Sequence, residues 1–112
     1  MKGSVMAYRF KSRMTGDVVM LAHNGKQLLE ILGKDPSGPG VLLFEDMPKA
    51  LTAIEQAIAK DEADYEARKQ EAQAKGEPEP EPERISLRVR TKPFVEMVNQ
   101  CMKEKVELVW GV

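Results

Sequence analysis

Apolar and polar positions follow their most regular pattern in the C-terminal part of the chain, from residue 85 to residue 112. Between residues 94 and 101 the apolar side chains recur at helical spacing, at Phe94, Met97, Val98 and Cys101. This spacing predicts a helix with one buried face. From residue 106 the period changes to two, with apolar side chains at Val106, Leu108 and Trp110. We therefore expect the chain to end in a half-buried strand, on which the N-terminal part packs.

The N-terminal part also has a period of two. Met6, Tyr8 and Phe10 would point to one side of an extended chain, and Arg9 and Lys11 to the other. Aromatic side chains at this period are typical of a half-buried strand. We expect this strand, around residues 8–11, to pair with the C-terminal strand around residues 106–110. Residues 1–5 precede the pattern and are expected to be dispensable, with Met6 as an alternative start.

Residues 18–32 fit two structures. The apolar run 18–21 is typical of a short strand, but Val18 and Leu21 also fall on one helical face with the leucines at 28, 29 and 32. Asn24-Gly25 is a break signal in either case, because glycine costs about 1 kcal/mol relative to alanine inside a helix. A helix from Gly25 to Leu32 is predicted in both, with Gly33 at its end. Residues 34–40 contain two prolines and two glycines, which predicts a loop.

A second amphipathic helix is predicted after the short apolar run 41–44. Its apolar residues recur at helical spacing, at Met47, Leu51, Ile54 and Ile58. Asp46 is predicted as its N-cap, and Pro48 falls in the first turn, where a missing N–H costs nothing. The alanines at 50, 53 and 57 would permit close approach of a neighbouring element.

Beyond Ile58 the sequence becomes polar and strongly charged. Helix-forming residues continue to Gly76, which predicts a helix that projects into solvent and ends at that glycine. Residues 77–83 read EPEPEPE and predict an extended acidic spacer, because each residue before proline is driven out of the helical region. We expect one domain, 1–112, in which a linker at about 71–84 separates the parts 6–70 and 85–112, with poor order between about 71 and 83.

Residues 85–92 give conflicting signals. Ile85, Leu87, Val89 and Thr91 alternate with polar residues, which predicts a strand, with Pro93 at the start of the following helix. The alternative is a helix that begins at Ser86 and continues through Pro93. That helix would cost about 3 kcal/mol unless it kinks. The residues alone favour the strand.

Several segments are specific as a set: YRFKS, DVVML, QLLEILG, MPKALTAIEQAI, SLRVRTKPFVEMV and VELVWGV. Together they resemble a bacterial domain-of-unknown-function family, DUF1840, over nearly the whole chain except residues 1–5 and the acidic linker. The resemblance implies a small, mostly helical cytoplasmic protein with no assigned activity, cofactor or catalytic residue. It also favours the kinked helix from Ser86, because the family has Gln and Ala where this chain has Val89 and Thr91. In the family, Ser-x-x-Gln would form a capping box.

Composition limits the classes of function. The 17 basic and 18 acidic residues nearly cancel, so no overall field favours nucleic acid or a membrane surface. A single cysteine cannot form an internal disulfide, which fits a reducing compartment. No apolar run approaches the roughly 18 to 20 residues of a membrane span. We expect a cytoplasmic protein with neither a membrane nor nucleic acid as its partner.

His23 and Cys101 are the candidates for catalysis or metal binding. His23 is the only histidine, and no second ligand stands at metal-ligand spacing from it. Cys101 falls on the apolar face with Phe94 and Val98, which favours a buried thiol over a reactive one. Methionines 20, 47, 97 and 102 are expected to fill the core rather than to line a groove. We therefore expect no catalytic residue, no metal site and no cofactor.

Basic residues give the main candidate for a ligand site. They gather in the N-terminal strand and before the last helix, at Arg9, Lys11, Arg88, Arg90 and Lys92. Together they would form a patch for phosphate or another polyanion. No exposed aromatics or glycine-rich phosphate loop accompany them, and the pI is about 5.9, which favours an ordinary solvated surface.

The expected fold is small and mainly helical α+β, with three helices packed on a short sheet formed by the N- and C-terminal strands. Such a small sheet leaves exposed edges, and the residues offer little for catalysis. We therefore expect a non-enzymatic interaction or regulatory module that binds a second copy of itself or an unidentified protein. The alternative is a binder of a small ligand or polyanion at the Arg88, Arg90 and Lys92 cluster.

Overall fold

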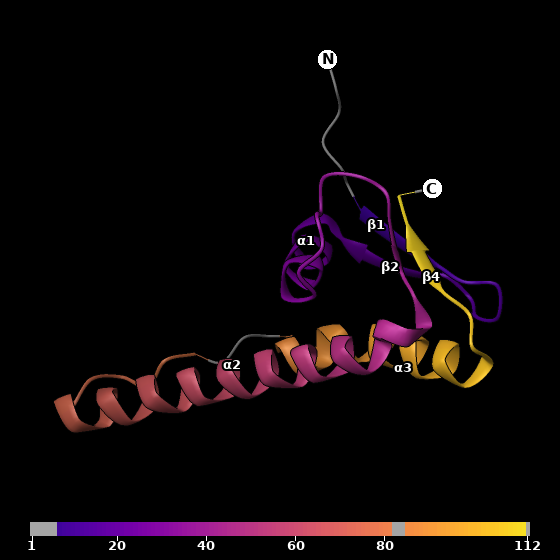
Figure 1. The fold of residues 1–112 in the computed structure, drawn as a ribbon. Coiled ribbons are helices and arrows are strands. Elements are labelled where there is room, and N and C mark those ends of the chain that lie inside the picture. Colours follow the sequence, from indigo (N-terminus) through magenta and orange to yellow (C-terminus); the bar gives the residue numbers. More distant parts are fainter. Residues whose placement is uncertain (1–6, 82–84, 112) are drawn as a thin grey trace, which may run out of the picture.

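The computed structural model describes residues 7–81 and 85–111. The expected N-terminal extension, the alternative start at Met6 and the end of the acidic linker, including Arg84, lie outside these ranges. The described residues form an α+β domain in which three helices pack with one antiparallel sheet (Figure 1). The predicted fold class is confirmed.

The sheet joins both ends of the chain. Within the described residues, its strands follow the order β2-β1-β4-β3. β1 (Ala7–Lys11) pairs with β2 (Val18–Leu21) on one side and with β4 (Leu108–Trp110) on the other, where Phe10 is opposite Trp110. β3 (Gly40–Leu42) pairs with the outer side of β4. The predicted pairing of the two terminal strands is confirmed, and residues 18–21 form a strand.

α1 (Ala22–Ile31) follows β2 without a loop and so begins earlier than the predicted Gly25. Gly25 does not break this helix, because the ring of Tyr8 lies directly against it. A Cβ atom at Gly25 would lie 2.3 Å from Tyr8 Cδ2, so glycine permits the close approach of α1 to β1. The helix ends as predicted near Gly33, whose φ is 74°.

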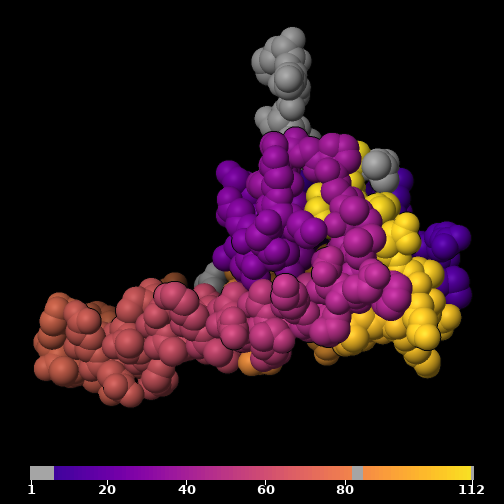
Figure 2. All heavy atoms as spheres, viewed as in Figure 1, coloured from indigo at the N-terminus to yellow at the C-terminus, as the bar shows by residue number. Residues whose placement is uncertain are grey.

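α2 (Met47–Lys75) is the longest element and ends, as predicted, at Gly76 in the left-handed conformation. Its first three turns bury the predicted apolar residues Met47, Ile54 and Ile58, and the remainder extends beyond the sheet as an arm (Figures 1 and 2). Residues 71–75, which the sequence placed in the linker, belong to this helix. The described part of the spacer returns along the arm, where the Tyr65 hydroxyl donates to the carbonyl of Pro80 at 2.9 Å.

The predicted capping role of Asp46 is wrong. The side chain of Asp46 makes no capping hydrogen bond, and its backbone has helical angles of φ −94° and ψ −4°. The cause is the 3-10 turn η1 (Phe44–Asp46), which leads directly into α2. A capping side chain needs an extended backbone at its own residue to reach the first free N–H groups, and this entry does not provide one.

α3 (Leu87–Glu104) resolves the conflict at residues 85–92 in favour of a helix. The hydroxyl of Ser86 accepts a hydrogen bond from the N–H of Val89 at 3.2 Å, and the helix continues through Pro93. The helix from Ser86 that the resemblance favours is therefore confirmed, and the strand favoured by the residues alone is wrong. The alternation also fits a helix, because Leu87, Thr91 and Phe94 are spaced by 4 and 3 and all three are buried.

The core lies between the helices and one face of the sheet. The ring of Phe10 on β1 meets Phe94 of α3 edge-on at 5.0 Å between centroids and lies 6.0 Å from Trp110. Cys101 is fully buried, as predicted. Three of the four methionines expected in the core are buried, and Met102 packs against it. The helices thus cover one face of the sheet, and several side chains on the opposite face are exposed.

Candidate functional site

The second face of the sheet is open among the described residues. Side chains alternate along each strand, so the neighbours of the buried Phe10, Met20, Leu42 and Trp110 point away from the core. Three of these neighbours are large and apolar, and they remain exposed: Val19 by 53%, Leu21 by 64% and Val41 by 39%. The register places Leu21 beside Ala7 and Val41 beside Val109, so these side chains share one surface. We call this surface the open sheet face.

Charged side chains on the open sheet face lie between its apolar flanks. Arg9 is opposite Val19, and its guanidinium forms an ion pair with Asp17 at 3.2 Å. Lys11 is opposite Val109, and no ion pair to Lys11 forms within the described residues. Glu107, two residues before Val109, alternates to the same face and is exposed. The face therefore carries two cations and two carboxylates among apolar side chains.

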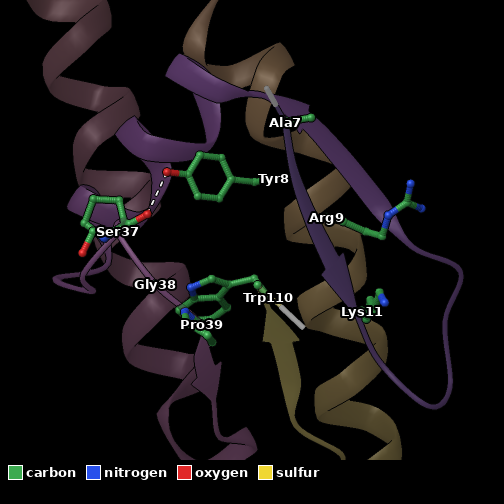
Figure 3. Close-up of a pocket in the computed structure, with 10 residues that line it drawn as sticks. Ala7, Tyr8, Arg9, Lys11, Ser37, Gly38, Pro39 and Trp110 are labelled. Carbon is green, nitrogen blue, oxygen red and sulfur yellow. Dashed lines mark hydrogen bonds between the residues drawn. The ribbon is translucent and has the colours of Figure 1, made fainter. Parts of the chain in front are cut away.

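A groove of about 430 Å³ lies where β4 ends, between β1 and the loop at residues 36–39 (Figure 3). We call it the Trp110 groove. Tyr8 and Trp110 point toward the loop, and Arg9 and Lys11 point to the other side of β1. The Tyr8 hydroxyl donates to the carbonyl of Pro36 at 2.8 Å and so fixes the loop to the sheet. The groove is lined on three sides by groups that are far apart in the sequence.

The indole N–H of Trp110 is a buried donor that no described residue accepts. The ring lies directly against Gly40 of β3, where a Cβ atom would be 2.3 Å from Trp110 Cζ2. Glycine at this edge position therefore creates the space for the indole. The adjoining loop is itself ordered by Asp35, which accepts hydrogen bonds from the Ser37 hydroxyl at 2.6 Å and the Ser37 N–H at 2.9 Å. These bonds lower the pKa of Asp35.

The five basic residues predicted as a ligand site do not form one patch. Arg9 and Lys11 lie on β1 and point away from the helices, whereas the other three lie on α3, which packs on the opposite face of the sheet. Arg88 is engaged with Glu62 of α2 through two hydrogen bonds of 3.0 and 3.3 Å, and a second carboxylate, Glu55, is 3.9 Å away. The bond to Arg88 lowers the pKa of Glu62 and raises that of Arg88.

The remaining predicted residues are also dispersed. Arg90 donates a hydrogen bond to Gln27 of α1 at 3.1 Å, which joins α3 to α1, and Lys92 is exposed. His23 is exposed on α1, whereas Cys101 is buried inside the domain, so the two do not form a pair. Within residues 7–81 and 85–111, no three side chains of the His, Cys, Asp and Glu types lie together as a metal site would require.

Sequence reasoning missed the residues of the Trp110 groove and the apolar part of the open sheet face. The loop at 34–40 was recognised from its prolines and glycines, but nothing local places it beside Trp110. The period of two at Val18 to Leu21 was visible, and it identifies Val19 and Leu21 as one face once these residues are assigned to a strand.

Comparison with known proteins identifies a family whose function is unknown. The family model for a domain of unknown function, DUF1840, matches residues 6–110. The chain belongs to this family. No curated protein and no solved structure matches the chain. Among the described residues of this DUF1840 protein, no helix is both long enough and apolar enough to cross a membrane.

Proposed function

We propose that this DUF1840 protein is a non-enzymatic interaction module that binds a second copy of itself through the open sheet face. The observation that carries the proposal is the exposure of Val19, Leu21 and Val41 on one continuous surface of the sheet. Burial of such side chains against a partner stabilises a complex by about 25 cal/mol for each Å² of apolar area removed from water. Exposed apolar side chains that share one surface mark a contact site more often than apolar side chains that are scattered singly.

The charges on the open sheet face favour a second copy as the partner. Two cations and two carboxylates balance, so two identical faces can meet without net repulsion. In a twofold dimer each contact occurs twice, and Lys11 of one copy can approach the Glu107 carboxylate of the other. A strongly acidic or basic partner would leave one pair of these charges without a counterpart. Arg9 and Asp17 already pair within the chain, so burial of Lys11 and Glu107 favours a partner that offers one carboxylate and one cation, as a second copy does.

The Ala-rich part of α2 is less suited to this role than the sheet. Ala50 is buried and Ala57 packs against the core, so the small side chains are used for contacts inside the domain. The strand edges are short, since β3 has three residues and β2 has four. A long ladder between copies cannot form along them. We place the module in a bacterial cytoplasm, in keeping with its single cysteine and its nearly balanced charge of 17 basic and 18 acidic residues.

Sedimentation velocity over a wide range of protein concentrations tests the proposal. The unaltered protein is expected to form a dimer, and Leu21→Lys and Val41→Lys are expected to be monomers with unchanged circular dichroism. Val89→Lys is the matched control, because Val89 is 57% exposed but lies on α3. It should remain dimeric. A monomer at every concentration of the unaltered protein would refute a second copy as the partner.

A charge exchange sharpens the test. Lys11→Glu and Glu107→Lys should each weaken the dimer, because each creates a face with a net charge of one sign. The double variant should recover part of the loss, since it restores the balance. If the two single losses simply add in the double variant, these residues do not meet across the interface.

A further inference from the structure

The arm of α2, residues 59–75, ends in a turn from which the spacer runs back along the helix (Figure 1). The turn is made by Gly76, which takes the left-handed conformation with a φ of 69°. The next N–H, that of Glu77, donates to the carbonyl of Ala72 at 2.8 Å. This is the first contact of residues 77–81 with the arm, and we call these residues the strap.

The strap contacts the arm at two further points, each nearer to the rest of the domain. Lys69 pairs with Glu79 at 3.2 Å, and the Tyr65 hydroxyl donates to the carbonyl of Pro80 at 2.9 Å. Between the first and the last contact, α2 advances by seven residues, or about 10 Å, and the strap by three extended residues, or about 9 Å. The strap therefore advances along the arm at nearly the same rate as the helix.

The strap covers the side of α2 that faces the core nearer to the sheet. Ile54, Ile58, Tyr65 and Ala72 are spaced by 4, 7 and 7, so they lie on one side of the helix. The two isoleucines belong to the core, whereas Ala72 is buried without belonging to it, and Tyr65 is half-buried. The strap thus replaces the core as the cover of this side along the arm.

The prolines of the strap keep it extended before it contacts the helix. Pro78 and Pro80 have a fixed φ, and the residues before them are driven out of the helical region. The strap therefore loses little conformational entropy when it lies on the arm. Its contacts are individually weak, because Lys69 and Glu79 are both partly exposed. A small entropic cost and weak contacts place the bound and released strap close in free energy.

We propose that the strap and the arm form a two-state device. In the closed state, which the structure shows, the strap covers the side of α2 that carries Tyr65 and Ala72 and keeps residues 59–75 helical. In the open state the strap leaves this side, the arm loses its helix in the same event, and Tyr65 is exposed. The device lies on the arm, so it does not depend on the proposed contact through the open sheet face.

Salt is the expected trigger, because the strap is charged. Among its glutamates, Glu77 and Glu81 form no ion pair within residues 7–81 and 85–111, and Glu79 pairs with Lys69. Added salt screens this exposed pair. High salt therefore favours the open state.

Amide hydrogen exchange of the full chain, followed by ¹H–¹⁵N NMR, tests the device. Tyr65→Phe removes the hydroxyl that donates to Pro80, and exchange in the arm should become about fivefold faster. Glu79→Gln removes the charge that pairs with Lys69 and should give about a twofold increase. Amides throughout residues 62–75 should change by one factor, because the arm opens as a unit, while α3 is unaffected.

Matched variants separate the strap from the helix itself. Glu77→Gln removes a strap carboxylate that has no ion pair among the described residues, and it should leave exchange in the arm unchanged. Glu79→Gln should have no further effect in a chain that already carries Lys69→Gln. High salt should accelerate exchange in the arm more in the unaltered protein than in Lys69→Gln. The proposal would be overturned if Tyr65→Phe left the arm unchanged, if faster exchange were confined to the amides beside Tyr65, or if Glu77→Gln acted as strongly as Glu79→Gln.

Discussion

α2 and α3 pack together over part of their lengths, but different interactions hold them in place (Figure 1). α3 buries side chains along nearly its whole length, from Leu87 to Cys101. In α2, four of the five buried residues lie between Met47 and Ile58, and only Ala72 is buried in the long remainder. Core packing therefore stabilises α3 along nearly its whole length, but it stabilises α2 only in its first part, up to about Ile58.

The second part of α2 depends on local contacts. Lys60 pairs with Asp64 at 3.1 Å and Lys75 with Glu71 at 2.8 Å, both one turn apart on the exposed helix surface. Such pairs contribute only about 0.3 to 0.5 kcal/mol each. The spacer adds the bond from Tyr65 to Pro80 and an ion pair between Lys69 and Glu79 at 3.2 Å, which raises the pKa of Lys69.

This difference implies that the two helices unfold separately. Regions with few buried apolar contacts open at lower free energy than the core does. The arm of α2, beyond about Ile58, should open while α3 and the sheet remain folded. Amide hydrogen exchange should therefore be fast in the arm and slow in α3, and each substitution below tests one part of this contrast.

The largest effect is expected from Phe94→Ala in the centre of α3. Phe94 is fully buried against Phe10, and its truncation should lower the free energy of unfolding by about 3 to 5 kcal/mol. Tyr65→Ala in the arm of α2 should lower it by about 1 kcal/mol or less, because the arm can open alone. Urea unfolding followed by Trp110 fluorescence, at a fixed low protein concentration, measures both.

If Phe94→Ala does not fold, Phe94→Leu gives the same comparison with a smaller loss. Equal losses for the substitutions at Phe94 and Tyr65 would show that α2 and α3 form one cooperative unit. The contrast between the helices would then be wrong.

Pro93→Ala should stabilise the protein by about 1 to 3 kcal/mol. Pro93 lies inside α3, so the carbonyl of Val89 has no N–H partner one turn later, and alanine would supply it. Pro48→Ala is the matched substitution in α2. Pro48 lies in the first turn, where an N–H has no helical partner, so its replacement should change stability by no more than about 0.5 kcal/mol.

The midpoint and slope of urea unfolding distinguish these outcomes. A loss of stability in Pro93→Ala would mean that the core has packed around the local geometry that proline imposes on α3.

Short-range patterns in the sequence predicted most of the helices and strands. The predictions that needed correction concern segments whose structure depends on how the chain enters a helix or on which side chains are buried. The periods at Tyr8 to Lys11 and at Leu108 to Trp110 identified the central strands. Asp46 has the right chemistry for a cap, but the chain enters α2 through a 3-10 turn. At residues 85–91 the sequence fits both the alternation of a strand and the spacing of a helix. Only the burial of Leu87 and Thr91 on one side of α3 distinguishes the helix from the strand.

The candidate sites were less predictable, because they depend on contacts between distant segments. Trp110 lies beside the loop at residues 36–39 only because β4 pairs with β3. The basic residues of β1 and α3 were expected to act together. They lie on opposite sides of β1, because α3 packs on the face of β1 opposite to Arg9 and Lys11. A sequence pattern predicts which side chains share one face of a strand, but the packing of a helix determines which face is exposed.

Ser86→Ala should lower the free energy of unfolding by about 1 kcal/mol. The Ser86 hydroxyl accepts from the N–H of Val89 at 3.2 Å, and its removal leaves that donor at the start of α3 without a side-chain partner. Asp46→Ala is the corresponding change at the start of α2. It should cost only a few tenths of a kcal/mol, because Asp46 makes no capping bond and contributes only its charge near the helix start.

Denaturant unfolding of the two alanine variants provides this comparison, and Ser86→Thr should retain most of the stability. Equal losses in Ser86→Ala and Asp46→Ala would mean that the 3-10 entry to α2 needs the Asp46 side chain after all.

The smallest effect concerns the ion pair between the helices, Arg88 with Glu62. The hydrogen bond from Arg88 lowers the pKa of Glu62 below its ordinary value of 4.5, so folding favours the ionised carboxylate. The stabilisation is therefore present above about pH 4.5 and is lost as the pH falls through the lowered pKa.

The unaltered protein should be slightly more stable than Glu62→Gln at neutral pH, and the difference should vanish in acid and shrink at high salt. Glu71→Gln, which removes a pair within α2 alone, serves as the control, and unfolding in urea across the pH range measures all three proteins. A difference between the unaltered protein and Glu62→Gln that persists unchanged into acid would show that Glu62 acts through packing, and that the charge pair does not join α2 to α3.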